Sequence, residues 1–346
     1  RFAFTPILPM MVEEGGLSLA RGGWLAAANY AGYLAGALSA IALKLQPATA
    51  IRAGLLAIGV STVGMGLDQS LLSWVVLRSM AGVGSAWVLV FVSTWALERL
   101  ARAQRPDLVG TLYAGVGAGI VVAGGACLFL VVSREAWMVL GTASLAATLA
   151  LWPRFDAAQG PETSRAVPAS TRPPGYWRLV LCYGAFGFGY IIPATFLPAM
   201  AREALGDPAV FGWAWPVFGG AAAASTLTAA LLARRFGSRR VWIVSHLVMA
   251  LGVVAPLLVP GAAGIGIAAL CVGATFVVIT MVALQEAAHA GGGALMAAMT
   301  AAFAAGQIAG PAFVSLLAYA GGGFAAASYA ACFLLLASAA ALAAGR

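Results

Sequence analysis

Charged side chains are scarce in this sequence, and their scarcity narrows the possible classes of protein. Only 9% of the 346 residues are Asp, Glu, Lys or Arg, whereas 62% are hydrophobic. Soluble domains carry roughly 25% charged residues, because polar groups must cover the surface that faces water. A soluble enzyme, a disordered chain and a nucleic-acid-binding domain are therefore poor interpretations. We expect a protein that crosses a membrane many times.

Groups that support catalysis or metal binding are also few. The chain has two His, and its four Cys lie within hydrophobic runs without the spacing of a zinc site or a disulfide framework. No Gly-x-x-x-x-Gly-Lys loop is present to hold nucleotide phosphates. We therefore predict a protein that is not an enzyme, with no cofactor and no metal site.

Hydrophobic segments of the length needed to cross a bilayer, roughly 20 residues, recur along the whole chain. The expected spans cover residues 1–12, 24–43, 49–67, 71–97, 108–132, 136–152, 175–201, 211–233, 241–259, 261–284, 294–320 and 321–344. The first span is short, and we read the sequence as a fragment that lacks its true N-terminus. Residues 153–174 are polar and rich in Pro, and they predict a linker between two six-helix bundles, 1–152 and 175–346.

The basic residues predict how the chain is oriented. Fourteen of the 19 Lys and Arg residues lie at the even-numbered connections between spans, in the linker or at the C-terminal end, and three lie at the odd-numbered connections. Cytoplasmic connections carry such an excess of Lys and Arg. We therefore predict a multi-pass protein of a bacterial inner membrane, with both termini in the cytoplasm. The net charge of +8 then reflects orientation, and we expect a monomer without a nucleic-acid partner.

An internal repeat relates the two halves of the chain. At an offset of 189 residues, Leu8-Pro9 matches Leu197-Pro198 and Gly23-Trp24 matches Gly212-Trp213. A constant offset at separate places predicts two parallel copies of one bundle, which is typical of one class of transporter.

Short motifs in the fourth and fifth spans carry a family resemblance. Arg78, Gly82, Gly84 and Ala86 match the pattern Arg-x-x-x-Gly-x-Gly-x-Ala, and a glycine-rich stretch follows at residues 115–125. With these motifs the whole chain resembles the major facilitator superfamily. The stretches RFAFTPILPMM, GWLAAANYAGYLAGAL and MTAAFAAGQIAGP resemble its YbfB-type branch.

The resemblance implies an all-α membrane protein of twelve transmembrane helices in two pseudo-symmetric bundles. It also implies a secondary transporter that works by rocker-switch alternating access. Two features depart from the family pattern: the fifth-span motif lacks its usual proline, and residues 44–49 lack the Asp-Arg expected in the first basic loop.

Arg1 is the most informative polar residue, because the family pattern places it near the middle of the first helix. A charge at that depth costs several kcal/mol unless it faces water or a partner. No Asp or Glu lies near the middle of any span. Arg1 either attracts an anionic solute into a central cavity or bonds to backbone carbonyls.

Six further residues are candidates for the substrate cavity. Thr5 shares a helical face with Arg1, and Tyr190 matches Arg1 in the repeat. Asn29, Tyr30 and Tyr33 interrupt the second span, and polar groups in lipid should face inward, toward either the cavity or a neighbouring helix. Gln307 is a weaker candidate of the same kind.

Gating and coupling have six candidates. Pro6, Pro9, Pro193 and Pro198 remove backbone donors from the first and seventh helices and predict kinks there. Arg78 either extends toward the membrane surface or, as the resemblance implies, takes part in coupling. Glu98 either bridges the two halves or is a solvated helix end.

Together these observations predict transport of a small organic solute across a lipid bilayer, coupled to an ion such as a proton. The absence of a carboxylate in the middle of a span favours an anionic or neutral polar solute. A proton-coupled exporter of drugs or cations, and a membrane sensor that binds without transporting, remain the alternatives.

Overall fold

The hydrophobic runs form long helices in the computed structural model, which describes residues 2–14, 17–43, 45–68, 70–155, 173–205, 208–319 and 323–344. The helices are α1 (Phe4–Glu13), α2 (Leu19–Ala42), α3 (Pro47–Leu67), α4 (Leu71–Arg102), α5 (Val109–Phe129), α6 (Ser133–Leu151), α7 (Tyr176–Leu205), α8 (Pro208–Phe236), α9 (Ser238–Leu258), α10 (Ala262–Tyr319) and α11 (Gly323–Ala344). Short 3₁₀ helices at Pro106–Leu108 and Trp152–Arg154 follow α4 and α6. These described residues contain no β-strand.

The helix α10 contains two of the expected spans. It has 58 residues, and inside it only Gly292 leaves the helical conformation, with φ 61° and ψ −153°. Glycine accepts a positive φ without a steric penalty, so one residue is enough to redirect the chain. The connection expected at residues 285–293 is therefore shorter than the sequence indicated. Ten helices of the described chain are long and apolar enough to cross a membrane, counting Ala262–Val314 once.

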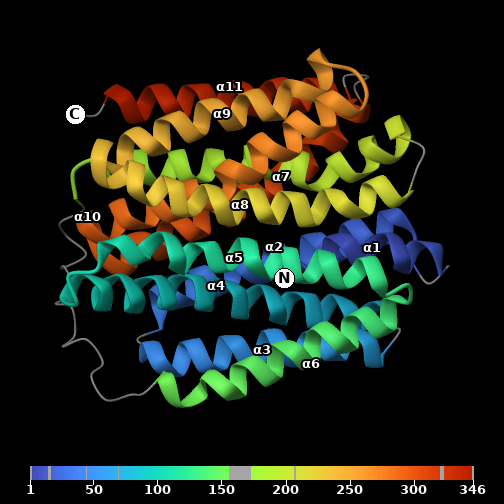
Figure 1. The fold of residues 1–346 in the computed structure, drawn as a ribbon, viewed down its shortest axis with the longest axis horizontal. Coiled ribbons are helices and arrows are strands. Elements are labelled where there is room, and N and C mark those ends of the chain that lie inside the picture. Colours follow the sequence, from blue (N-terminus) through green and yellow to red (C-terminus); the bar gives the residue numbers. More distant parts are fainter. Residues whose placement is uncertain are drawn as a thin grey trace.

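The helices lie side by side along one direction, and chain order decides their neighbours (Figure 1). In what we call the N-half, α1–α6, the helix α4 packs on α2 and α3, and α3 packs on α6. In the C-half, α7–α11, the helix α10 packs on α7 and α9, and α11 packs on α9. Contacts of α5 with α8 and of α10 with α2 and α4 join the halves.

Small residues allow the helices of each half to approach closely. A Cβ atom on Gly82 of α4 would lie 2.2 Å from the carbonyl oxygen of Asn29 in α2. A Cβ atom on Gly306 of α10 would lie 2.3 Å from the carbonyl oxygen of Gly184 in α7. In lipid, helices associate through such packing rather than through the hydrophobic effect. These glycines therefore set the spacing of the helices.

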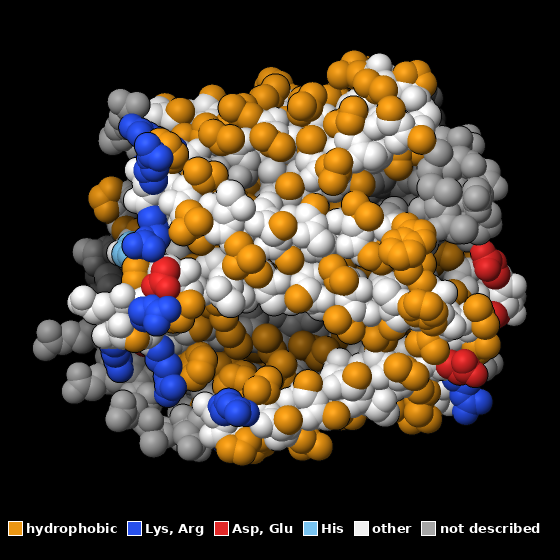
Figure 2. Space-filling model, in the orientation of Figure 1, with side chains coloured by type: hydrophobic (Ala, Val, Ile, Leu, Met, Phe, Trp, Pro, Cys, Tyr) orange, Lys and Arg blue, Asp and Glu red, His pale blue; other side chains and the backbone are white. Residues whose placement is uncertain are grey.

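The surface shows where lipid and water would lie. Most of the visible arginine side chains gather at one end of the molecule, on the left in Figure 2, and hydrophobic side chains cover the flank. Large apolar side chains of the described chain are exposed, such as Phe129 at 87% and Leu72 at 76%. We call the arginine-rich end the basic end. It contains the last turns of α4 and α8, with Arg99, Arg102 and Arg234.

Candidate functional site

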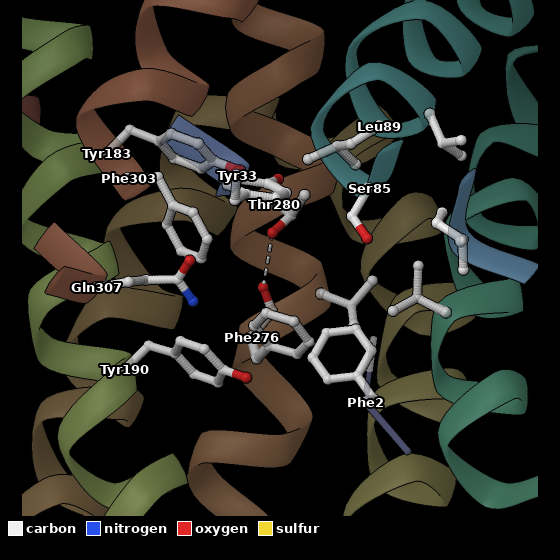
Figure 3. Close-up of a pocket in the computed structure, with 14 residues that line it drawn as sticks. Phe2, Tyr33, Ser85, Leu89, Tyr183, Tyr190, Phe276, Thr280, Phe303 and Gln307 are labelled. Carbon is white, nitrogen blue, oxygen red and sulfur yellow. Dashed lines mark hydrogen bonds between the residues drawn. The ribbon is translucent and has the colours of Figure 1, made fainter. Parts of the chain in front are cut away.

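A cavity of about 210 Å³ lies between the N-half and the C-half. Helices α2, α3, α4 and α5 line it from one side, α7 and α10 line it from the other, and Phe2 lies just before α1 (Figure 3). The lining residues are Phe2, Tyr33, Ile58, Ser85, Val88, Leu89, Val116, Tyr183, Tyr190, Phe276, Val277, Thr280, Phe303 and Gln307. No member of this set carries a charge, so the described lining offers aromatic and aliphatic surface with a few neutral polar groups.

Aromatic rings form one wall of the cavity. The rings of Tyr190 and Phe276 stack with their centroids 4.4 Å apart and their planes 11° from parallel. Phe303 lies 6.2 Å from Tyr190 at 22° and 5.3 Å from Tyr183. Phe186 supports this wall from behind, 5.0 Å from Phe303. Helix α7 supplies the tyrosines and α10 supplies the phenylalanines of the wall, so the wall belongs to the C-half.

Besides the tyrosines, three neutral polar side chains line the cavity: Ser85 of α4, and Thr280 and Gln307 of α10 (Figure 3). Ser85 of α4 donates its hydroxyl hydrogen to the carbonyl oxygen of Ala81, at 2.7 Å. Thr280 of α10 donates to the carbonyl oxygen of Phe276, at 3.1 Å. Because each hydroxyl hydrogen is used within its own helix, the oxygen lone pairs remain available to accept. The third group, the amide of Gln307, has both donors and an acceptor.

The structure brings together three of the residues that the sequence singled out for the cavity. Tyr33, Tyr190 and Gln307 line it, and all three are buried. Thr5 and Tyr30 are partly exposed and are not among the lining residues. Arg1 lies outside the described residues, and in the sequence it directly precedes Phe2.

Asn29 is fully buried but contacts a neighbouring helix instead of the cavity. Its Nδ2 donates to the carbonyl oxygen of Arg78 at 2.9 Å, which joins α2 to α4. This is the helix–helix bond that the sequence left open as an alternative. A polar side chain in lipid satisfies its donor with whichever acceptor its helix neighbour offers.

Arg78 lies inside the N-half rather than at the membrane surface. Its side chain is 5% exposed, and its guanidinium carbon lies 4.3 Å above the centre of the Phe4 ring. The Arg78 side chain therefore does not extend toward the membrane surface in this structure. The face of an aromatic ring carries partial negative charge and attracts a cation held over it. Glu98 is partly buried near the basic end and does not line the cavity.

The four prolines differ in their effect on the helices. Pro6 lies in the first turn of α1, where its missing N–H removes no bond within the described helix. Pro9 lies inside α1 and removes one such bond. Pro193 is buried within α7; Pro198 belongs to the same helix, but its side chain lies outside the described part. Kinks at all four positions were expected, and only the last three prolines lie at interior helical positions.

Sequence reasoning missed several lining residues, mainly Phe2, Phe276 and Phe303. Phenylalanine in a hydrophobic span gives no sign of whether it faces lipid, a neighbouring helix or a cavity. Ser85 and Thr280 did leave a signal, because each is a hydroxyl residue within a span. No group of three or more His, Cys, Asp or Glu that could hold a metal occurs among the described residues.

Comparison with known proteins gives one family and many similar folds. The family model described as "Uncharacterised MFS-type transporter YbfB" matches residues 1–343. No curated protein matches the sequence. The human organic anion transporter MFSD10 (TETRAN) is similar in structure, with a TM-score of 0.71 and 14% identity over 98% of this chain and 89% of that one. A variant of the E. coli fucose:proton symporter FucP has a TM-score of 0.68 and 12% identity over 99% and 95%. At such identities the likeness shows the fold alone.

Proposed function

Since this chain belongs to the YbfB-type family of major facilitator transporters, we propose that it moves a small organic solute by alternating access. The observation that carries the proposal is the cavity, which side chains of both the N-half and the C-half line. In transporters built from two repeats, the solute site lies at the interface of the repeats, and rocking of one against the other opens it to each side in turn. In this proposal the segments 1–152 and 175–346 are the two rocking bundles.

The proposed solute is uncharged or singly anionic. A charge transferred from water into a site without a counter-charge is strongly unfavourable, and the described lining is neutral. A carboxylate would then require Arg1, which precedes the lining residue Phe2. Because a site for cations would be expected to offer an acid, this lining disfavours the cation exporter.

We further propose that a proton or another ion drives the transport and that the basic end faces the bacterial cytoplasm. Arginine-rich ends of membrane proteins face the cytoplasm, and the basic end carries most of the visible arginines. Modification of an introduced cysteine at Arg102, in intact cells and in inverted vesicles, tests this orientation. An impermeant thiol reagent should label this cysteine in inverted vesicles only. Labelling from outside intact cells would contradict the proposed orientation.

The test of the function is exchange of solute through the purified protein. A thermal-stability screen of neutral and anionic organic compounds first finds ligands, since a ligand at 100 times its Kd adds about 2.7 kcal/mol to the stability of a folded protein. Proteoliposomes loaded with such a ligand should then accumulate the labelled compound against its gradient, and an imposed pH gradient should change the rate. Binding without exchange under every gradient would instead identify a membrane sensor.

A variant of Arg1 separates anionic from neutral solutes. Arg1→Gln is expected to weaken binding of an aromatic carboxylate at least about tenfold, because a hydrogen bond to a charged group contributes about 1.5–3 kcal/mol. Binding of the neutral alcohol of the same shape should stay within about twofold. Titration calorimetry on the purified protein measures both. The control is Arg21→Gln, at an exposed position in α2. Equal carboxylate binding by both variants would remove Arg1 from the site.

A further inference from the structure

We infer that the cavity is a site for a planar aromatic solute of one or two fused rings that carries a hydrogen-bond donor. This inference rests on the function proposed above and specifies its substrate class. Three properties of the described lining support it, namely its volume, the parallel arrangement of its rings and the state of its hydroxyl groups. Each of them limits the solute in a different way.

The volume limits the size of the solute. A cavity of roughly 150 Å³ in a protein interior binds benzene. The cavity here has a volume of about 210 Å³, which exceeds the volume of that benzene-binding cavity by less than half. It therefore accommodates one ring with a substituent or two fused rings, and it is too small for typical drug-sized ligands, whose pockets run to about 300–1,000 Å³.

The aromatic wall limits the shape of the solute. Tyr190, Phe276 and Phe303 are all buried, and the planes of Phe276 and Phe303 lie 11° and 22° from that of Tyr190. Because Tyr190 and Phe276 cover part of each other's faces, a further ring would pack on the edges and the uncovered faces of this cluster, in the offset or edge-on geometry that aromatic pairs prefer. Phe186 packs against Tyr190 at 5.9 Å and against Phe303 at 5.0 Å from behind, which holds the wall in place. A saturated solute would cover the same area without the interaction between rings.

The hydroxyl groups limit the polarity of the solute. Ser85 and Thr280 donate their hydrogens to carbonyl oxygens of their own helices, so each presents an acceptor to the cavity. An O–H or N–H group of the solute can bond to them without breaking an existing bond. A solute that only accepts would have to bond to Gln307 or to a tyrosine hydroxyl of the lining, because Ser85 and Thr280 could donate to it only by giving up their helical carbonyls. Gln307 can donate or accept, so it adds no preference of its own.

The two acceptors belong to different halves of the molecule. Ser85 is on α4 of the N-half, and Thr280 is on α10 of the C-half. Figure 3 shows their oxygens facing the same space from different walls. A donor on the solute is thus available to either half, and the aromatic wall holds the ring on the side of the C-half.

Three compounds of similar size test the inference on the purified full chain. They are 2-naphthol, decahydro-2-naphthol, which keeps the hydroxyl donor but has no aromatic ring, and 2-methoxynaphthalene, which keeps the rings but has no donor. Titration calorimetry is expected to show that 2-naphthol binds about fivefold more tightly than either of the others, since one net hydrogen bond or one aromatic pair typically contributes such a factor. Equal affinity for all three compounds overturns the inference.

Paired variants assign the preference to named side chains. Thr280→Val should remove the advantage of 2-naphthol over 2-methoxynaphthalene, whereas Thr275→Val, on the same helix and outside the lining, should keep it. Phe276→Leu should remove the advantage over decahydro-2-naphthol, whereas Phe188→Leu, which pairs with Phe313 and does not line the cavity, should keep it. If both members of a pair behave alike, that side chain does not select the solute.

The flux of the same compounds distinguishes this inference from the proposed function. Binding of 2-naphthol with the expected preferences, but without exchange in proteoliposomes, supports the aromatic site and contradicts transport. Exchange of aliphatic solutes, together with no preference for 2-naphthol, supports transport and overturns the aromatic site.

Discussion

Replacement of Gly117 in α5 with leucine is expected to reduce transport at least about tenfold, because the side chain would force α5 away from α8. A Cβ atom at Gly117 would lie 2.4 Å from the backbone nitrogen of Ala223 and 2.6 Å from the carbonyl oxygen of Gly219. Backbone atoms cannot move aside as a flexible side chain can. The two helices belong to different halves, so the whole contact between the halves must shift.

The control for this variant lies on the same helix. Gly119 is exposed, and a Cβ atom there would meet nothing within 4 Å. Gly119→Leu should therefore transport within about twofold of the parent chain, since an exposed apolar side chain on a membrane-spanning helix is compatible with lipid. Initial flux is measured in proteoliposomes at equal protein, and gel filtration confirms that both variants are folded and monodisperse. Normal flux in Gly117→Leu would show that the halves do not depend on this contact.

Gly117 is part of a regular contact between α5 and α8. Gly110 faces Ala230, and Gly124 faces Pro216, so glycines at intervals of seven residues meet the partner helix along its length. Seven residues make nearly two turns, which keeps these positions on one side of the helix. Two helices that meet through such a smooth surface can tilt against each other without disengaging interlocked side chains. We therefore expect the α5–α8 contact to be the place about which the halves move.

The sequence predicted the helices well because hydrophobic length is a strong signal in a membrane protein. It did not predict which hydrophobic residues face the cavity. Phe303 is 4% exposed and lines it, whereas Phe129 is 87% exposed and does not. In a soluble protein the polarity of one helical face separates such residues. A membrane-spanning helix has apolar surroundings on every side, whether lipid or protein. The difference in polarity between its faces therefore disappears.

Polar residues within the spans could be predicted to face inward, whereas phenylalanines could not. Tyr33, Asn29 and Gln307 were predicted to face inward, and all three are buried. The sequence could not decide between a cavity and a neighbouring helix for any of them. That choice depends on which backbone lies opposite, as the bond from Asn29 to the carbonyl of Arg78 illustrates. The change of direction at Gly292 was also not predicted. Residues 291–293 are all glycine, and the sequence does not show which of them takes a positive φ.

Cross-linking α4 to α10 at the basic end is expected to stop transport, and cleavage of the link should restore it. The Oγ1 atom of Thr94 lies 3.5 Å from the Sδ atom of Met296, so the two halves touch there. Alternating access requires these helices to separate when the cavity opens toward the basic end. In a chain whose four natural cysteines are replaced, Thr94→Cys and Met296→Cys are joined by a short thiol-reactive reagent with a reducible bond.

A link within one half is the matched control for this experiment. The Oγ atom of Ser238 in α9 lies 3.4 Å from the Oε1 atom of Gln285 in α10, near the same end. Both residues belong to the C-half. Cysteines at these two positions, joined by the same reagent, should leave flux within about twofold, because a half that moves as one body does not change its internal distances. Loss of flux in both pairs would mean that motion within the C-half is required. Unchanged flux with Thr94 and Met296 linked would exclude rocking of the halves at this contact, and solute would then have to reach the cavity without separation of α4 from α10.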